Sequence, residues 1–436
     1  MANSSRPGPG FGADLAGRAR SMWCRRRAVA GFLIAWSLGA GPAAAQDSAG
    51  TVTFEQAQSA ALAQAPALLA RHAAAQAAQG AIPAAGQLPD PKLAVGIENF
   101  PISGPDRYSW RRESMTMRRL AWMQDVPNAD KRAAQRGSAD ALGQRELALW
   151  RAEQASVRRE TALAWLALYY AQRRLEVLPA LEKENAVLQE TLDARVASGR
   201  AMPVDVLLAR QEALDLAERR DELQAQLAHA ALALRRWTGD AVERTAGPPP
   251  ALAIQPAGVM AGLDRHAELE AFEPMLAMAR AEVDQARAAR RGDWGWEVGY
   301  ANRDRRWGDM VSVQLTFELP VSVATRQEPL VAARLKDVER LQAEQEDARR
   351  RVQADVQTQL AELQRLERGV RRQTEAAVPL AQERSRLALA GYESGRGDLA
   401  SVLAARRDAV QAQLRLLELE SLLMAQRARL TYLIVE

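Results

Sequence analysis

The chain has 436 residues, of which 48% are hydrophobic, with a formal net charge of +4 and one cysteine. Six arginines and one aspartate fall within the first 45 residues, which leaves 52 basic against 53 acidic residues in the remainder. That remainder therefore has a net charge of −1, and this excludes nucleic-acid binding through bulk positive charge.

The first 45 residues have the pattern of a secretory signal peptide. Arginines precede an apolar run at 28–38, and small residues at 43–45 place cleavage after Ala45. The run is far shorter than the ~20 residues of a membrane-spanning helix, which argues against the alternative of a membrane anchor. Because Cys24 would leave with this segment, we expect a mature chain that begins near Gln46 without acylation or a disulfide.

The mature chain begins with a predicted helix followed by two extended segments. Residues 53–87 have apolar side chains at helical spacing and predict one helix. Residues 92–97 alternate between apolar and polar side chains, which is typical of a strand. A second strand is predicted at 112–124, where the alternation slips at Arg118-Arg119 and a β-bulge is one explanation.

The second half repeats this order behind a linker rich in proline and glycine. Two strands with one apolar and one polar face are predicted at 294–300 and 311–319. The predicted organisation is a signal peptide, a first repeat, a linker and a second repeat, at 1–45, 46–246, 247–262 and 263–436.

Each repeat also predicts a long helical hairpin. The two hairpins are predicted at 128–198 with 203–237 and at 325–394 with 398–433, and Pro379 lies inside the second long helix. Aligned without gaps, 194–234 and 390–430 share fourteen identical residues, which indicates a duplication. The hairpins turn at two equivalent tripeptides, Ser198-Gly199-Arg200 and Ser394-Gly395-Arg396, where glycine supplies the left-handed backbone of a tight reversal.

The strands suit a bilayer, because a tilted strand crosses the hydrocarbon in ~9 to 11 residues. Nine of the 22 aromatic residues fall in the two strand regions, 92–125 and 294–319, which suits membrane interfaces as well as an ordinary core. Four strands are too few to close a barrel, so several copies would have to share one. The side chains expected to face lipid are Leu93, Val95, Ile97, Trp294, Trp296, Val311, Val313 and Leu315.

The order of helix, strand pair, long helix, glycine turn and return helix, given twice behind a signal peptide, resembles the TolC family of outer-membrane efflux channels. The resemblance covers essentially the whole mature chain. The most specific matches are the two hairpin turns, at 195–207 and 391–403. Further motifs are similar to its heavy-metal efflux branch, at 89–93, 97–101 and 123–132. The resemblance implies a fold that is mainly α with β, in which a homotrimer forms a twelve-strand outer-membrane barrel and an α-helical periplasmic tunnel. It also implies docking of the tips to a periplasmic adaptor and an inner-membrane RND-type pump.

The resemblance further implies a gate at the hairpin tips. In the family an acid six residues after the first tip glycine pairs across hairpins with residues that flank the second, and Asp205 holds that position. Its candidate partners here are Tyr392 and Arg396, although the basic residue of the family lies one position later. The alternative is a structural role, because an acid in the first turn of a helix is favoured by the helix dipole, and Asp398 would serve the other hairpin in the same way.

No pattern in the sequence indicates an enzyme or a cofactor site. The sequence has three scattered histidines, and it contains no phosphate-binding loop and no metal-ligand spacing. It therefore offers no catalytic constellation. Met115, Met117 and Met123 suggest copper or silver ligands, but methionine is more often apolar filler. We expect a channel that passes heavy-metal cations. The alternatives are a drug or organic-solvent channel of the same family, or a soluble periplasmic coiled-coil adaptor.

Overall fold

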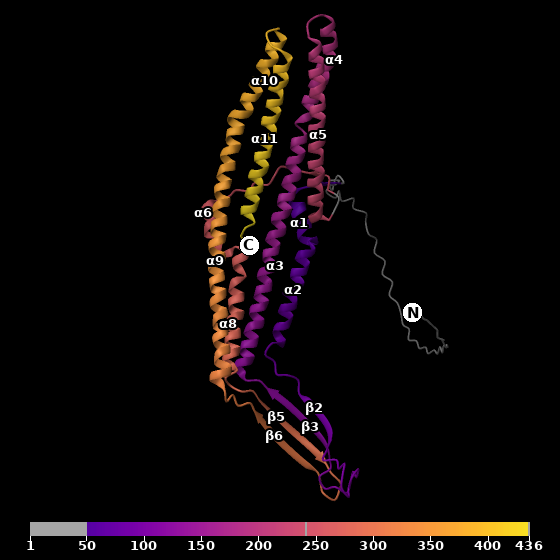
Figure 1. Ribbon diagram of the computed structural model, residues 1–436, viewed down its shortest axis with the longest axis vertical. Coiled ribbons are helices and arrows are strands. Elements are labelled where there is room, and N and C mark those ends of the chain that lie inside the picture. Colours follow the sequence, from indigo (N-terminus) through magenta and orange to yellow (C-terminus); the bar gives the residue numbers. More distant parts are fainter. Residues whose placement is uncertain (1–49, 240–241, 435–436) are drawn as a thin grey trace, which may run out of the picture. The chain divides into compact units, whose positions relative to one another are not determined.

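The computed structural model describes residues 50–239 and 242–434 (Figure 1). The expected signal peptide and its cleavage site lie outside these residues. The described residues belong to one unit, Ser48–Glu436, and contain a four-stranded sheet and two helical hairpins.

The first half supplies two strands of the main sheet and one hairpin. Its elements are β1 (Thr51–Val52), α1 (Phe54–Gln64), α2 (Pro66–Ala81), β2 (Lys92–Glu98), β3 (Met117–Val126), α3 (Ala129–Leu175), α4 (Leu178–Ala197) and α5 (Pro203–Thr238). The short strand β4 (Arg244–Thr245) pairs with β1 in parallel, a pairing too short to be predicted from periodicity.

The second half supplies the same parts in the same order. Its elements are α6 (Pro256–Ala261), α7 (Ala267–Glu270), α8 (Phe272–Ala288), β5 (Trp294–Asn302), β6 (Met310–Phe317), α9 (Val323–Arg372), a π-helical turn (Gln373–Ala377), α10 (Val378–Glu393) and α11 (Leu399–Thr431). Helix α6 lies within the segment that was expected to be a linker.

The main sheet is antiparallel throughout, with the strand order β2-β3-β5-β6. The two halves therefore meet at the β3–β5 pair. Strand β3 differs from the prediction, because it begins at Met117 and the residues from Arg112 to Thr116 form bends and a turn. Its register against both neighbours is continuous, so the bulge offered as an explanation at Arg118-Arg119 is absent.

The helices next to the sheet follow the order of the strands. Helix α2 precedes β2, α3 follows β3, α8 precedes β5 and α9 follows β6. Helix α3 packs against both α2 and α8, and α8 packs against α9. The helices α2, α3, α8 and α9 therefore pack side by side in the same order as the strands to which they are connected. The hairpin tips lie at the ends of the helices away from the sheet (Figure 1).

Prolines divide the helices that the sequence predicted as continuous. Helix α1 ends before Pro66, because proline disfavours helical backbone at the residue before it, and Ala65 there has ψ of 114°. Pro179 and Pro379 occupy the first turns of α4 and α10, where a missing amide hydrogen costs little. The first long helix is interrupted before Pro179, and the second changes to a π turn before Pro379.

The largest packed core surrounds Trp165 of α3, which is fully buried. The Phe54 ring meets the indole edge-on with 5.5 Å between centroids, and the indole Nε1 donates to the Val52 carbonyl at 3.2 Å. This core joins α1, α3, α5 and α11, so it holds the return helices of both hairpins against α3. In the described part of the chain no helix combines the length and apolar character of a membrane span.

Candidate functional site: the sheet faces and the hairpin tips

One face of the sheet is largely apolar. The register places Val95 beside Leu120, Leu120 beside Tyr300, and Tyr300 beside Val311. The expected lipid-facing residues all lie on this face, and each of them is exposed except Trp296, which is half-buried. The face also contains side chains that the sequence reasoning did not assign, namely Leu120, Trp122, Val298, Tyr300 and Phe317.

The opposite face of the sheet is polar and centres on Arg119. Its guanidinium forms ion pairs with Glu98 on β2 and with Glu297 on β5, so one side chain bridges three strands. A Cβ atom at Gly299 would lie 3.2 Å from the arginine Nε, so the glycine leaves the space that this side chain occupies. Arg118 lies on the apolar face instead, at the end of β3 next to the loops. The two adjacent arginines therefore lie on opposite faces of the sheet.

Aromatic rings gather at both ends of the apolar face. At the loop end Tyr108, Trp110 and Trp307 are each about half exposed or more. At the helix end Trp294 stacks on Phe317 with 6.5 Å between ring centroids. Between these levels the face has aliphatic side chains together with Trp122, Trp296 and Tyr300. Rings concentrated near the two ends are typical of strands that cross a bilayer.

The two hairpin turns have the same backbone geometry. Gly199 has φ of +70° and Gly395 has φ of +72°, both in the left-handed region. The amide of the residue after each glycine donates back into the helix, from Arg200 to the Arg195 carbonyl at 2.8 Å and from Arg396 to the Gly391 carbonyl at 2.9 Å. These are Schellman turns, and they leave the Arg200 and Arg396 side chains exposed.

The candidate gate residues are not in mutual contact in this single chain. The Asp205 carboxylate accepts a hydrogen bond from the Met202 amide at 2.8 Å and so caps α5. The Tyr392 ring lies under Arg195, 5.0 Å from the guanidinium carbon, and its buried hydroxyl has no hydrogen-bond partner among the described residues. Asp398 caps α11 through the Ser401 amide at 3.3 Å. Asp205 and Asp398 therefore have the structural role of capping α5 and α11, and the gate stays a prediction.

The tips of the two hairpins pack on each other through an apolar cluster. Leu192 and Ala209 of the first hairpin are fully buried against Leu399, Val402 and Leu403 of the second. Sequence reasoning missed this contact, because the apolar residues at the tips are predicted only as helical stripes.

Ion pairs further along the hairpins also link them. The Arg407 Nε lies 3.7 Å from Glu212, and its Nη1 lies 3.7 Å from Asp215. Burial raises the pKa of the Glu212 carboxyl, and the nearby Arg407 partly offsets that rise. These pairs between α5 and α11 could have been found only by aligning the two hairpins in space.

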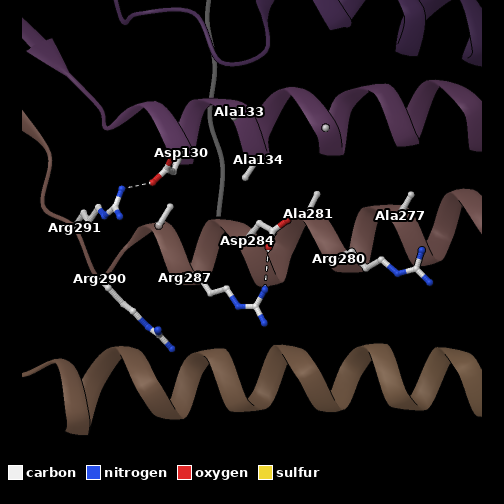
Figure 2. Close-up of a pocket in the computed structure, with 12 residues that line it drawn as sticks. Asp130, Ala133, Ala134, Ala277, Arg280, Ala281, Asp284, Arg287, Arg290 and Arg291 are labelled. Carbon is white, nitrogen blue, oxygen red and sulfur yellow. Dashed lines mark hydrogen bonds and ion pairs between the residues drawn. The ribbon is translucent and has the colours of Figure 1, made fainter.

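The described residues contain no cluster of histidine, cysteine and acidic side chains of the kind that holds a metal ion. No group of three or more His, Cys, Asp or Glu side chains is gathered closely enough within 50–239 and 242–434. An open groove between α3 and α8 is lined by four arginines and two aspartates, and both aspartates pair with an arginine of the groove (Figure 2). Arg291 lies 2.8 Å from Asp130, and Arg287 lies 3.3 Å from Asp284.

Comparison of the coordinates with solved structures decides the fold. The chain superimposes on CusC, described in connection with transmembrane channel formation, with a TM-score of 0.76 at 17% identity, over 88% of this chain and 92% of that one. It matches the outer membrane protein VceC of Vibrio cholerae with a TM-score of 0.71 at 19% identity, over 87% and 95%. The open outer membrane channel MtrE of Neisseria gonorrhoeae gives 0.68 at 16%, over 87% and 88%.

The chain has the fold of these outer-membrane channels. The predicted fold of duplicated helical hairpins with four strands is thereby confirmed. The shared trimeric barrel and the periplasmic tunnel are properties of an assembly, and they stay predictions for this chain. No protein-family model and no curated protein matches the sequence.

Proposed function

We propose that this protein is a TolC-family channel of the outer membrane and a component of a tripartite efflux system. The observation that carries the proposal is the sheet, which has one largely apolar face and one polar face. Its aromatic rims and its attachment to two long hairpins support the same function. Such a sheet is stable in a bilayer only when its apolar face contacts lipid and its edges are paired.

The edges of the sheet indicate how many chains are needed. Within the described residues, β2 and β6 each have a partner on one side only. Both edge strands must pair in a bilayer, and the edges of a neighbouring copy are the partners that symmetry offers. Three copies would supply twelve strands, and the polar face with Arg119 would line the lumen.

The hairpin tips are the proposed docking surface for the periplasmic adaptor. The two equivalent turns expose Ser198, Arg200, Ser394 and Arg396 beside Gly199 and Gly395. Six such turns in a trimer would form a ring at the end of the tunnel. An inner-membrane RND-type pump would deliver cargo through that ring, and the channel itself would perform no chemistry and need no cofactor.

Location is tested by density-gradient separation of the two membranes after cleavage of the signal peptide. We expect the mature chain, beginning near Gln46 and unacylated, in the outer-membrane fraction and extractable only with detergent. Recovery in the soluble periplasmic fraction would favour the adaptor alternative instead.

For the cargo we propose heavy-metal cations, on the basis of the motifs at 89–93, 97–101 and 123–132. Drug or organic-solvent efflux is the second candidate, because channels of this family select little and the pump chooses the cargo. A deletion strain tested on a metal panel and a drug panel separates them. We expect metal sensitivity that the plasmid-borne gene reverses, and sensitivity to drugs alone would contradict the metal assignment.

A further inference from the structure

A cluster of arginines lies at the loop end of the sheet, opposite the helices. The loops that follow β2 and β5 approach each other there and enclose a pocket. Five arginines and a single aspartate line it, together with Trp110, Thr116 and Asn302; the arginines are Arg111, Arg118, Arg303, Arg305 and Arg306. All but Arg303 are exposed, so the pocket presents a strong positive charge at one rim of the apolar face.

None of these five guanidinium groups forms an ion pair with a carboxylate in the described part of the chain. The nearby acids are already engaged in local hydrogen bonds. Asp309 accepts from the Tyr300 hydroxyl and from Asn302 Nδ2, and Asp304 accepts from the Arg306 amide at 3.3 Å. Arg303 is fixed by the Gly308 carbonyl at 2.8 Å, and the other four side chains remain available for an external anion.

An apolar groove adjoins the arginine pocket and shares three of its residues. Trp110, Arg111 and Arg118 line both, and Val95 and Ile97 extend the groove along β2 on the apolar face. The Arg118 guanidinium lies 5.8 Å from the Trp110 ring, which itself packs on Phe100 with 4.9 Å between centroids. A ligand that fits both cavities must combine an anionic head with hydrocarbon.

We propose that this composite site binds a phosphorylated, multiply acylated glycolipid of the outer leaflet. Guanidinium groups recognise phosphate through paired, charge-assisted hydrogen bonds, and several arginines together suit a head with more than one phosphate. An acyl chain would lie along Val95 and Ile97, continuous with the surface assigned to lipid. This inference rests on the proposed function, which places the loop end of the sheet at the outer leaflet.

The test is native mass spectrometry of the protein in detergent, titrated with a bis-phosphorylated, hexa-acylated lipid A. The same titration uses the dephosphorylated lipid, phosphatidylglycerol and inorganic phosphate. We expect the bis-phosphorylated lipid to bind most tightly, and the double variant Arg305→Gln/Arg306→Gln to weaken it at least about tenfold, as loss of charged hydrogen bonds predicts. The matched control is Arg290→Gln/Arg291→Gln at the helix end, which removes two exposed arginines outside the pocket and should leave binding unchanged.

Equal binding of the dephosphorylated lipid, equal loss in both double variants, or full competition by inorganic phosphate alone would each overturn the proposal. Conductance of the same preparation in planar bilayers keeps the two claims apart. A conducting channel without selective lipid binding would overturn only the lipid site, and selective binding without conductance would overturn only the proposed function.

Discussion

Arg119 of β3 forms an ion pair with Glu297 of β5 across the junction of the two repeats. The same guanidinium binds Glu98 on β2, so the charges of three neighbouring strands meet at one side chain. Gly299 leaves room for it, and the Glu297 side chain is only 19% exposed. The network therefore fixes the register between a strand of the first half and a strand of the second.

Replacing Arg119 with leucine should destabilise the sheet more than loss of an ordinary surface ion pair. Two carboxylates would remain close together on the polar face without a cation. The measurement is the urea concentration at the midpoint of unfolding, followed by tryptophan fluorescence in lipid vesicles. Lys92→Met is the control, because Lys92 and Asp125 pair at 2.8 Å while both side chains are more than half exposed. Equal midpoints for the two variants would contradict the bridging role.

Val313→Arg should impair insertion of the sheet. Val313 is 71% exposed in the middle of the apolar face, and an arginine on a lipid-facing strand costs about 2 to 4 kcal/mol near the bilayer midplane. The yield of folded protein in vesicles, read as protease resistance, measures the effect. Gln314→Arg places the same charge on the polar face of the same strand and should fold nearly as well. If both variants folded equally, the assignment of the two faces would be wrong.

The Asp205→Ala variant tests whether Asp205 only caps α5 or also belongs to the predicted gate. Loss of the bond to the Met202 amide should cost about 0.5 to 2 kcal/mol of stability in either case. If Asp205 also closes the tip, the variant should conduct more than the parent in its resting state in planar bilayers. Asp398→Ala is the matched control, because it removes a cap from α11 without touching the predicted gate. Equal resting conductance of parent and both variants would leave only the capping role.

Glu212 should make the contact between the hairpins depend on pH. Its pKa is raised by burial, so the folded protein holds the proton more tightly than the unfolded chain does. The contribution of this carboxyl to the free energy of unfolding is complete below the ordinary pKa of 4.5 and is lost as pH rises through the raised value. Arg406, Arg407 and Asp215 are the charged groups that act on it.

We therefore expect Glu212→Gln to gain thermal stability relative to the parent at pH 8 and to lose that advantage at pH 4, below the ordinary pKa. The measurement is the midpoint of thermal unfolding by circular dichroism at both pH values. Asp215→Asn serves as the control, since it removes a half-exposed carboxylate from the same Arg407 and should show a smaller change between the two pH values. A Glu212→Gln difference that is the same at pH 4 and pH 8 would refute the account.

Sequence periodicity predicted the strands well where both faces were distinct. Residues 92–97, 294–300 and 311–319 lie in or overlap β2, β5 and β6, because one face is apolar and the other polar along their length. The prediction was wrong at the start of β3. Met115 fits the alternation of a strand, but it lies in the loop before β3, outside the residues that pair with β2. The helix interruptions were missed because helical periodicity continues across Pro66, Pro179 and Pro379.

The candidate sites were predictable only in part, for a physical reason. The tip glycines are visible in sequence because a left-handed backbone selects glycine, and φ at Gly199 and Gly395 agrees. Contacts between distant segments leave no local pattern. The Arg119 bridge, the Glu212 pair and the arginine pocket each combine residues from two or more elements, and only their positions in space bring them together.

The central claim is that copies of this chain form a water-filled channel through the outer membrane. The most direct measurement is single-channel recording of the purified, detergent-extracted protein in planar lipid bilayers. We predict stepwise conductance of uniform size that is absent from a Val313→Arg preparation of equal concentration. A parent protein that inserts into the bilayer as a folded assembly and yet conducts no ions would contradict the claim.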